Sequence, residues 1–208
     1  MKWFFLLLMF SPAFSQPAEK GTFREADLVE LVTLDSTIRL DVRYATSNNF
    51  MGRKMYTQAR AFLQRPAAEA LVRAHRALRS QGFGLLVFDG YRPWDVTKKF
   101  WDETPRSKRK YVANPRRGSN HNRGCAVDLS LYDLRSRREV DMPSPYDDFT
   151  NKAAADFDGG TVAERRTRKI LRDAMENAGF KVNPDEWWHF DYKDWREYRI
   201  LNIPFECL

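Results

Sequence analysis

The sequence is poor in the two residue types that most often bind metals or form cross-links. Its 208 residues include three histidines and two cysteines, Cys125 and Cys207. Two cysteines allow one intramolecular disulfide at most, so several bridges are excluded and a single Cys125–Cys207 bridge stays open. The sequence also has no internal repeat and no low-complexity linker, which favours one domain.

A dense basic stripe is absent as well. The formal net charge is +7, and the basic runs RSKRK (106–110) and RRTRK (165–169) are short. Such runs are usually solvated faces, and nucleic-acid binding needs a denser stripe in a recognisable motif, so we expect no nucleic-acid partner. Hydrophobic residues make up 43% of the chain, including fifteen Phe and six Trp, which indicates a globular protein with a core.

The apolar run WFFLLLMF at residues 3–10 is too short to cross a bilayer, which takes about 20 residues. Lys2 precedes this run, and AFS precedes Gln16, an order that is typical of a secretory signal peptide and its cleavage site. No cysteine follows the run, so we expect no lipid anchor there. We predict a signal peptide at 1–15, one domain at 16–208, no stable membrane insertion, and export to the periplasm or the extracellular space.

Hydrophobic periodicity predicts both helices and strands. Residues 65–82 and 161–180 have helical spacing, and each carries a glycine that suits a helix C-terminus. Alternating or continuous apolar segments predict strands at residues 37–45, 83–93, 125–133 and 186–192. Because helices and strands are interspersed and several strand faces are polar, we predict an α+β fold, with a mainly antiparallel sheet and helices packed on one side.

The three histidines separate into one structural position and two candidate functional positions. His75 falls at the edge of the apolar face of the helix at 65–82, where a core or boundary histidine is the simplest interpretation. His121 and His189 each lie within a few residues of a carboxylate. A catalytic zinc commonly has three protein ligands and one position for water, and His121, Asp128 and His189 can supply that set.

Three further residues extend this set toward catalysis. Gly124 lies between the first two candidate ligands and lets the chain bend so that both face one ion. Glu186, three residues before His189, is placed to take a proton from a metal-activated water and pass it to a leaving amine. Arg92 follows a turn at the end of a buried strand, where a guanidinium can stabilise an oxyanion.

Two other interpretations stay open from these residues alone. Two histidines and one carboxylate also form the facial triad of non-haem Fe(II) oxygenases. That triad usually has a close His-x-Asp pair and needs no general base, so Glu186 favours hydrolysis. Alternatively, Trp187, Trp188 and His189 pack in the core, and Asp128 only caps the backbone.

Four segments of the sequence are characteristic when they are taken together: RYATSNNFMG (43–52), DGYRP (89–93), SNHNRGCAVDLSLYDL (119–134) and EWWH (186–189). In this order they resemble the D-alanyl-D-alanine dipeptidases, zinc peptidases related to the D-Ala-D-Ala carboxypeptidases and to the hedgehog-type fold. The similarity runs from about Leu31 to Pro204, nearly the whole mature chain.

The resemblance implies a role for each candidate residue. The zinc ligands fall on His121, Asp128 and His189, the catalytic base on Glu186, and the arginine that steadies the tetrahedral intermediate on Arg92. Positions that hold the two ends of the substrate fall on Ser119 and Asp147, and Tyr44 falls near the pocket. The stretch around Asp147 departs from the family's usual Met-Gly. Relatives tend to have a small residue such as Ser at Cys125, and a bridge to Cys207 would brace the segment between two ligands.

The activity implied is zinc-dependent hydrolysis of the free dipeptide D-alanyl-D-alanine to two D-alanines in cell-wall precursor turnover, with one Zn2+ per chain. The nearest alternative is a D,D-carboxypeptidase or endopeptidase that acts on peptidoglycan stem peptides. A zinc-stabilised binding module without catalysis is a further alternative that the hedgehog relation allows, although every catalytic position is filled here.

Overall fold

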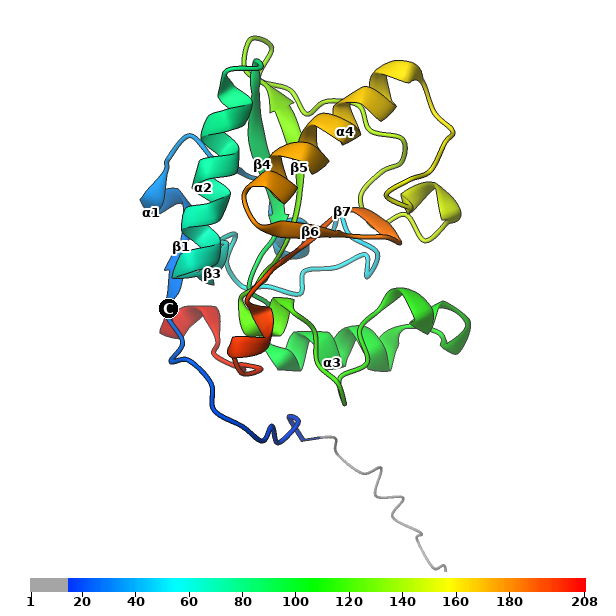
Figure 1. The fold of residues 1–208 in the computed structure, drawn as a ribbon. Coiled ribbons are helices and arrows are strands. Elements are labelled where there is room, and N and C mark those ends of the chain that lie inside the picture. Colours follow the sequence, from blue (N-terminus) through cyan, green and yellow to red (C-terminus); the bar gives the residue numbers. More distant parts are fainter. Residues whose placement is uncertain (1–14) are drawn as a thin grey trace, which may run out of the picture.

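The chain is organised around a five-stranded sheet, as a computed structural model that describes residues 15–208 shows (Figure 1). The strands lie in the order β2-β4-β5-β7-β6. Their bounds are Arg39–Leu40 (β2), Phe83–Asp89 (β4), Ala126–Asp133 (β5), Phe180–Asn183 (β6) and Glu186–Tyr192 (β7). β2 is parallel to β4, whereas the other neighbouring pairs are antiparallel, so the prediction of a mainly antiparallel sheet is confirmed.

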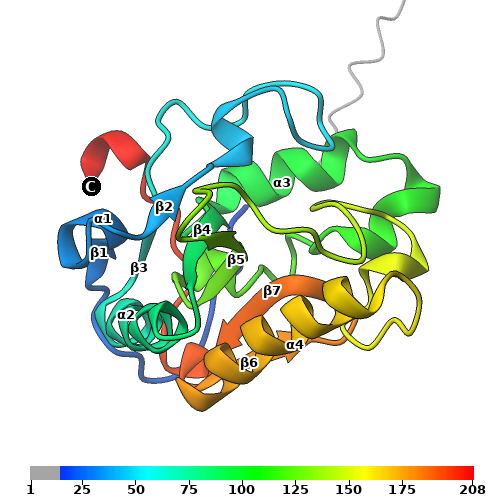
Figure 2. The ribbon, with the colours of Figure 1, turned by 90° about the horizontal axis from the view of Figure 1, so that it is seen from above.

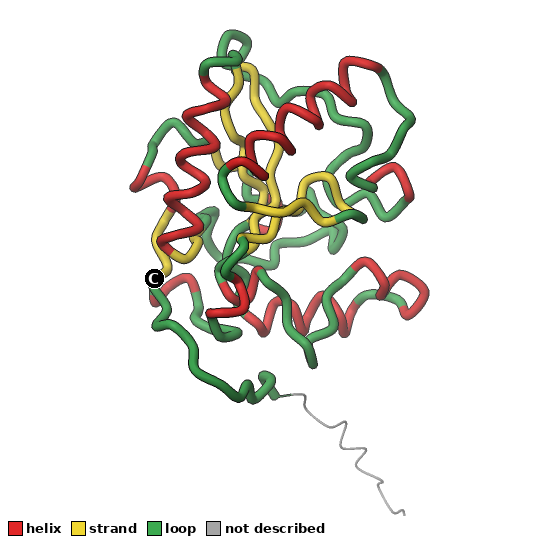
Figure 3. The backbone as a smooth tube through the Cα atoms, in the orientation of Figure 1, coloured by secondary structure: helices red, strands yellow, loops and turns green. Residues whose placement is uncertain are grey.

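Smaller elements surround this sheet. A second, two-stranded sheet pairs β1 (Leu28–Glu30) with β3 (Phe62–Gln64), and the short helix α1 (Leu31–Leu34) follows β1. Loops and short 3₁₀ turns make up much of the remaining chain (Figure 3). The turns are η1 (Arg43–Ala45), η2 (Arg106–Tyr111), η3 (His121–Arg123), η4 (Asn151–Ala153), η5 (Trp195–Glu197) and η6 (Phe205–Cys207).

Two long helices, α2 (Arg65–Arg79) and α4 (Val162–Asn177), cover one face of the five-stranded sheet (Figure 2). α2 has Pro66 in its first turn, where a missing backbone N–H costs nothing. α4 begins with a capping box, because the Thr161 hydroxyl accepts the Glu164 N–H while the Glu164 carboxylate accepts the Thr161 N–H. Both predicted helices are therefore confirmed.

The remaining helix, α3 (Trp94–Glu103), lies on the other side of the sheet (Figure 2). Its Phe100 belongs to a cluster of mainly aromatic residues. Here the predicted strand at 37–45 is only partly correct, because β2 is two residues long and the chain then turns into η1. The Tyr44 ring lies 4.7 Å from Phe100 and 5.7 Å from Tyr56. These packing contacts outweigh the local alternation of apolar residues, which is a weak signal by itself.

The predicted signal peptide falls on residues 1–14, which lie outside the described part of the chain, and on Ser15. Within residues 15–208, no helix combines the length and the apolar character that a membrane crossing requires.

His75 is buried where α2 packs on the sheet, so its interpretation as a core residue is confirmed. Its Nδ1 accepts the Leu85 N–H at 3.1 Å, and its Nε2 lies 2.9 Å from Thr37 Oγ1. Because Nδ1 accepts, the neutral ring carries its proton on Nε2 and donates it to Thr37. Burial lowers the pKa of His75 below its usual value, and the nearby charge of Asp35 opposes this only in part.

This lowered pKa predicts a pH-dependent contribution to stability. Below about pH 6.5 the unfolded chain binds a proton at His75 that the folded chain does not bind, so stability present above that pH is lost as the pH falls. Relative to His75→Gln, the wild type should lose up to about 1.4 kcal/mol per pH unit. Urea unfolding of both proteins between about pH 8 and pH 5 measures the difference, and a pH-independent difference would contradict the assignment.

Candidate active site

Three polar side chains meet where β5 and β7 pair. In the antiparallel register, Asp128 of β5 lies opposite His189 of β7, so these two candidate ligands are cross-strand neighbours. His121 begins η3, and Gly124 carries the chain from that turn into β5. Gly124 has a φ of +67°, and a Cβ there would lie 2.5 Å from Cδ2 of Leu28, so the turn requires glycine.

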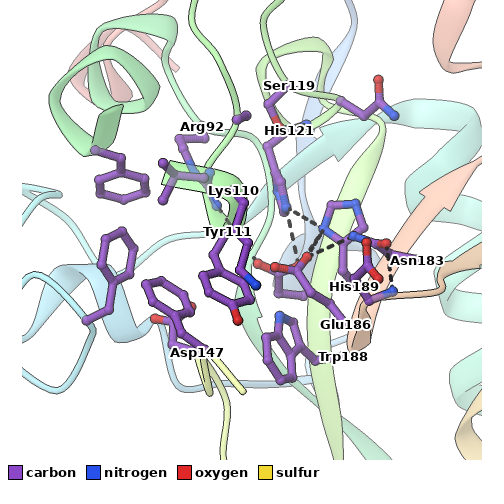
Figure 4. Close-up of a pocket in the computed structure, with 18 of the residues that line it drawn as sticks. Arg92, Lys110, Tyr111, Ser119, His121, Asp147, Asn183, Glu186, Trp188 and His189 are labelled. Atoms are coloured by element: carbon purple, nitrogen blue, oxygen red, sulfur yellow. Dashed lines mark hydrogen bonds and ion pairs between the residues drawn. The ribbon is translucent and has the colours of Figure 1, made fainter. Parts of the chain in front are cut away.

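The ligand atoms of these three residues form a small triangle (Figure 4). His121 Nε2 lies 3.1 Å from His189 Nδ1, which lies 3.0 Å from Asp128 Oδ1, and Asp128 Oδ1 lies 3.3 Å from His121 Nε2. Zinc binds nitrogen and oxygen ligands at about 2.0–2.2 Å, so two tetrahedral ligands lie roughly 3.3–3.6 Å apart. The observed separations lie at or just below this range, so these three atoms are close enough together to share one cation. In the described part of the chain, this is the one group of His, Cys, Asp or Glu side chains found close enough to share an ion.

A shell of hydrogen bonds turns both imidazoles toward that position. The other ring nitrogen of His121, Nδ1, lies 2.7 Å from the Gly90 carbonyl, and His189 Nε2 lies 3.0 Å from Asp191 Oδ1. Because both partners are acceptors, each ring can donate outward, which leaves its other nitrogen available to a metal. The sequence analysis missed Asp191, although residues two apart on a strand share a face and this spacing could have indicated it.

The charges of this cluster also favour a cation. Burial alone would raise the pKa of Asp128, but the charges and hydrogen bonds of His121 and His189 hold it well below its usual value. Asp128 also accepts a hydrogen bond from the Tyr146 hydroxyl at 3.0 Å. Burial lowers the pKa of His189, but Asp128 and Asp191 together raise it well above its usual value. A buried, ionised carboxylate between two imidazoles is stabilised by added positive charge.

Glu186 lies beside the triangle at the start of β7 and lines the same pocket. Its Oε2 is 3.9 Å from His189 Nδ1 and accepts a hydrogen bond from Asn183 Nδ2 at 3.0 Å. Burial, the largest effect, raises the pKa of Glu186, and His189 opposes the rise. A carboxylate whose pKa is moved toward neutrality suits proton transfer in both directions.

Arg92 is held by Asp89 next to Asp128 of the His-Asp-His triangle. Its Nε and Nη2 donate to Asp89 Oδ2 at 3.0 and 2.7 Å, and Asp89 also accepts from the Tyr56 hydroxyl at 2.8 Å. The guanidinium lies over the rings of Tyr44 and Phe100, at 5.3 and 4.9 Å from their centres. Its Nη2 is 3.9 Å from Asp128 Oδ2, so the remaining N–H donors are close to the metal-binding position.

All the candidate site residues line one pocket with a volume of about 680 Å³ (Figure 4). Tyr44 and Asp147, far apart in sequence, are joined there, since the Tyr44 hydroxyl donates to Asp147 Oδ1 at 3.1 Å. Burial and the charge of Asp128 raise the pKa of Asp147 to about 8. Ser119 also lines the pocket, and its hydroxyl accepts the His121 N–H at 3.3 Å.

The two cysteines do not form the bridge that the sequence left open. Both are free: Cys125 is buried and Cys207 is exposed in η6. Cys125 and Val127 belong to the hydrophobic core, whereas Asp128 faces the pocket. The Cys125 thiol contacts the Arg123 carbonyl at 3.6 Å. Strand alternation thus separates the thiol from the ligand cluster.

A buried His-Asp-His set beside a carboxylate and a fixed arginine can bind one metal ion and place a base next to it, an arrangement expected of a metal-dependent hydrolase. A family model described as D-ala-D-ala dipeptidase matches residues 24–206, and the chain belongs to this peptidase family, as the sequence motifs predicted.

Two relatives agree with this family assignment in sequence. The D-alanyl-D-alanine dipeptidase of Escherichia coli (strain K12) is 31% identical over 181 residues, which cover 87% of this chain and 92% of the relative. The D-alanyl-D-alanine dipeptidase of Enterococcus faecium is 34% identical over 178 residues, which cover 76% and 87%. The solved structure of the vancomycin resistance D,D-dipeptidase VanXYg has a TM-score of 0.44 and 22% identity, and covers 66% of this chain and 53% of that one.

The hydrogen bond from His189 predicts that Asp191 increases metal affinity without being a ligand. Asp191→Asn keeps the side-chain shape but weakens the acceptor, and we expect zinc affinity to fall about 10- to 100-fold. Competition with a chromogenic chelator measures this affinity. Asp185→Asn is the matched control, because Asp185 lines the same pocket and is not part of the ligand cluster. Equal affinities for the two variants would contradict the role of Asp191.

The free cysteines predict unequal reactivity. Burial raises the pKa of the Cys125 thiol to about 12, so a thiol reagent near neutral pH should label only Cys207 in the folded protein. In urea both cysteines should react. Mass spectrometry counts the added groups, and failure of both cysteines to react in urea without a reductant would show that the bridge forms after all.

Proposed function

We propose that this protein is a zinc-dependent dipeptidase that hydrolyses free D-alanyl-D-alanine to two D-alanines. The observation that carries the proposal is the His121–Asp128–His189 triangle beside Glu186, in a chain of the D-Ala-D-Ala dipeptidase family. Two imidazole nitrogens and one carboxylate oxygen form a ligand set typical of catalytic zinc. The adjacent carboxylate favours hydrolysis over the oxygenase alternative, which has no use for a base at that position.

The residues of the pocket divide the reaction between them. Bound zinc supplies a Lewis acid that polarises the scissile carbonyl and lowers the pKa of a water. Glu186 accepts the proton of the attacking water and then delivers it to the departing amine of D-alanine. Arg92, held by Asp89, donates hydrogen bonds to the oxyanion of the tetrahedral intermediate. Because these groups are positioned before substrate binds, little reorganisation is needed during the reaction.

The free ends of the dipeptide need their own partners. Its ammonium group matches the carboxylate of Asp147, which Tyr44 holds in place. Ser119 lines the same pocket, and its hydroxyl, which accepts the His121 N–H, is available to the carboxylate end. Acylation of the substrate removes the ammonium group, so a stem-peptide D,D-carboxypeptidase would not need Asp147.

We also place the reaction outside the cytoplasm, in the turnover of cell-wall precursors. The support is the sequence before Gln16, with Lys2, the apolar run at 3–10 and small residues at the cleavage position. A mature chain that begins at Gln16 in the exported fraction is the expected result, and an uncleaved chain in the cytoplasmic fraction would contradict it.

The direct test combines metal analysis with D-alanine release. The purified protein should contain about one zinc per chain and should release D-alanine from D-alanyl-D-alanine faster than from its N-acetyl derivative. Preference for the acylated substrate would support the carboxypeptidase alternative. A zinc-loaded protein that releases no D-alanine from either substrate would support the non-catalytic module.

Replacement of the base separates catalysis from metal binding. Glu186→Gln should lower kcat about 100- to 10,000-fold, because general acid–base catalysis contributes that much, while the zinc content stays unchanged. Glu176→Gln on the exposed face of α4 is the control and should retain full activity. Persistent hydrolysis by a zinc-loaded Glu186→Gln variant would overturn the assignment of the base.

A further inference from the structure

More carboxylates than basic side chains line the pocket. Two cationic side chains line it, Arg92 and Lys110, against a larger set of carboxylates: Asp128, Asp147, Asp185, Glu186 and Asp191. Arg92 is already balanced by Asp89, with 2.7 Å between Nη2 and Oδ2. A substrate carboxylate that enters this pocket therefore has one lining cation left to pair with, which is Lys110.

Lys110 is free to take that role. Its ammonium lies 4.6 Å from the centre of the Tyr111 ring, and within residues 15–208 no carboxylate forms an ion pair with it. Tyr111 in turn stacks on Phe149, with ring centres 4.8 Å apart and an interplanar angle of 8°. This stack holds the end of η2 against the pocket, and Figure 4 shows Lys110 and Tyr111 among the residues around the cavity.

The segment that carries Lys110 contains no acidic side chain that would compete with an anion for the Lys110 ammonium group. Residues 104–120 contain no Asp or Glu, and their cations are Arg106, Lys108, Arg109, Lys110, Arg116 and Arg117. The same segment ends near Ser119, the hydroxyl already assigned to the carboxylate end of the dipeptide. The basic run RSKRK at 106–110 is thus more than a solvated face, because its last residue lines the pocket.

We propose that Lys110 binds the free α-carboxylate of the substrate and so makes the enzyme specific for peptides that end one residue after the scissile bond. This inference rests on the proposed dipeptidase function and adds a specificity-determining residue to it. The ammonium end pairs with Asp147, the carboxylate end pairs with Lys110, and the scissile carbonyl lies between them at the metal-binding position. A charge pair of this kind acts on the bound substrate and the transition state alike, so its loss raises KM more than it lowers kcat.

The test compares three variants on two substrates. Lys110→Gln removes the charge, Lys110→Arg keeps it, and Lys108→Gln is a matched control on the same turn that does not line the pocket. The substrates are D-alanyl-D-alanine and D-alanyl-D-alaninamide, which lacks the terminal charge. On the free acid we expect Lys110→Gln to lose about 10- to 100-fold in kcat/KM, mostly through KM, whereas the other two variants stay within about threefold.

The substrate D-alanyl-D-alaninamide tests whether the loss of kcat/KM in Lys110→Gln comes from the charge of the substrate carboxylate. On D-alanyl-D-alaninamide the wild type should be reduced to about the level of Lys110→Gln, and the substitution should change kcat/KM less than about twofold. An equal loss on both substrates, or no loss on the free acid, would overturn the role of Lys110. If the zinc-loaded wild type hydrolyses neither substrate, the proposed function itself fails, which is a result distinct from either of these.

Discussion

The register between β5 and β7 is the constraint on which the active site depends. Asp128 lies opposite His189 only in this pairing, and a slip by one residue would turn Asp128 toward the core and bring Val127 to the pocket. The apolar residues of both strands oppose such a slip, because Val127 and Phe190 are fully buried on the core side. The core under α2 and α4 therefore positions the candidate metal ligands, although none of its side chains is itself one of them.

The candidate metal ligands and the candidate base could be predicted from the sequence, because few side-chain types can bind zinc or transfer a proton. Once His75 was assigned to the core, two histidines remained, each near a carboxylate, and this limited the possible ligand sets. Both long helices could be predicted from hydrophobic periodicity and capping residues. The geometry around Glu186 was not accessible in the same way. Residues three apart on a regular strand face opposite sides, yet Glu186 and His189 line one pocket. The pairing of β6 with β7 shifts between Val182 and Asn183, and such an irregularity re-aims side chains.

The pocket buries several carboxylates close to one another, and this favours the binding of cations. The carboxylates of Asp128, Asp147 and Glu186 share a space from which water is partly excluded, and burial raises the pKa of the latter two. Removing charged groups from water is costly unless opposite charge compensates them. The pocket therefore gains from each cation it receives, whether a metal ion among the histidines or the ammonium end of a peptide beside Asp147. Under the proposed function, a small zwitterion suits this pocket because its two ends need opposite partners a short distance apart.

The alternation of side chains where the chain enters β5 also keeps a cysteine thiol apart from the candidate metal ligands. Cys125 and Asp128 are three positions apart in sequence, but Cys125 belongs to the core whereas Asp128 lines the pocket. A soft thiolate ligand at the cluster would bind copper and zinc tightly and would be open to oxidation. Because the described residues that line the pocket include no Cys or Met, the cluster offers nitrogen and oxygen alone, and oxidants that enter with the solvent meet no sulfur there. The backbone at the start of β5 thus lies between the oxidisable Cys125 thiol and the candidate metal ligands.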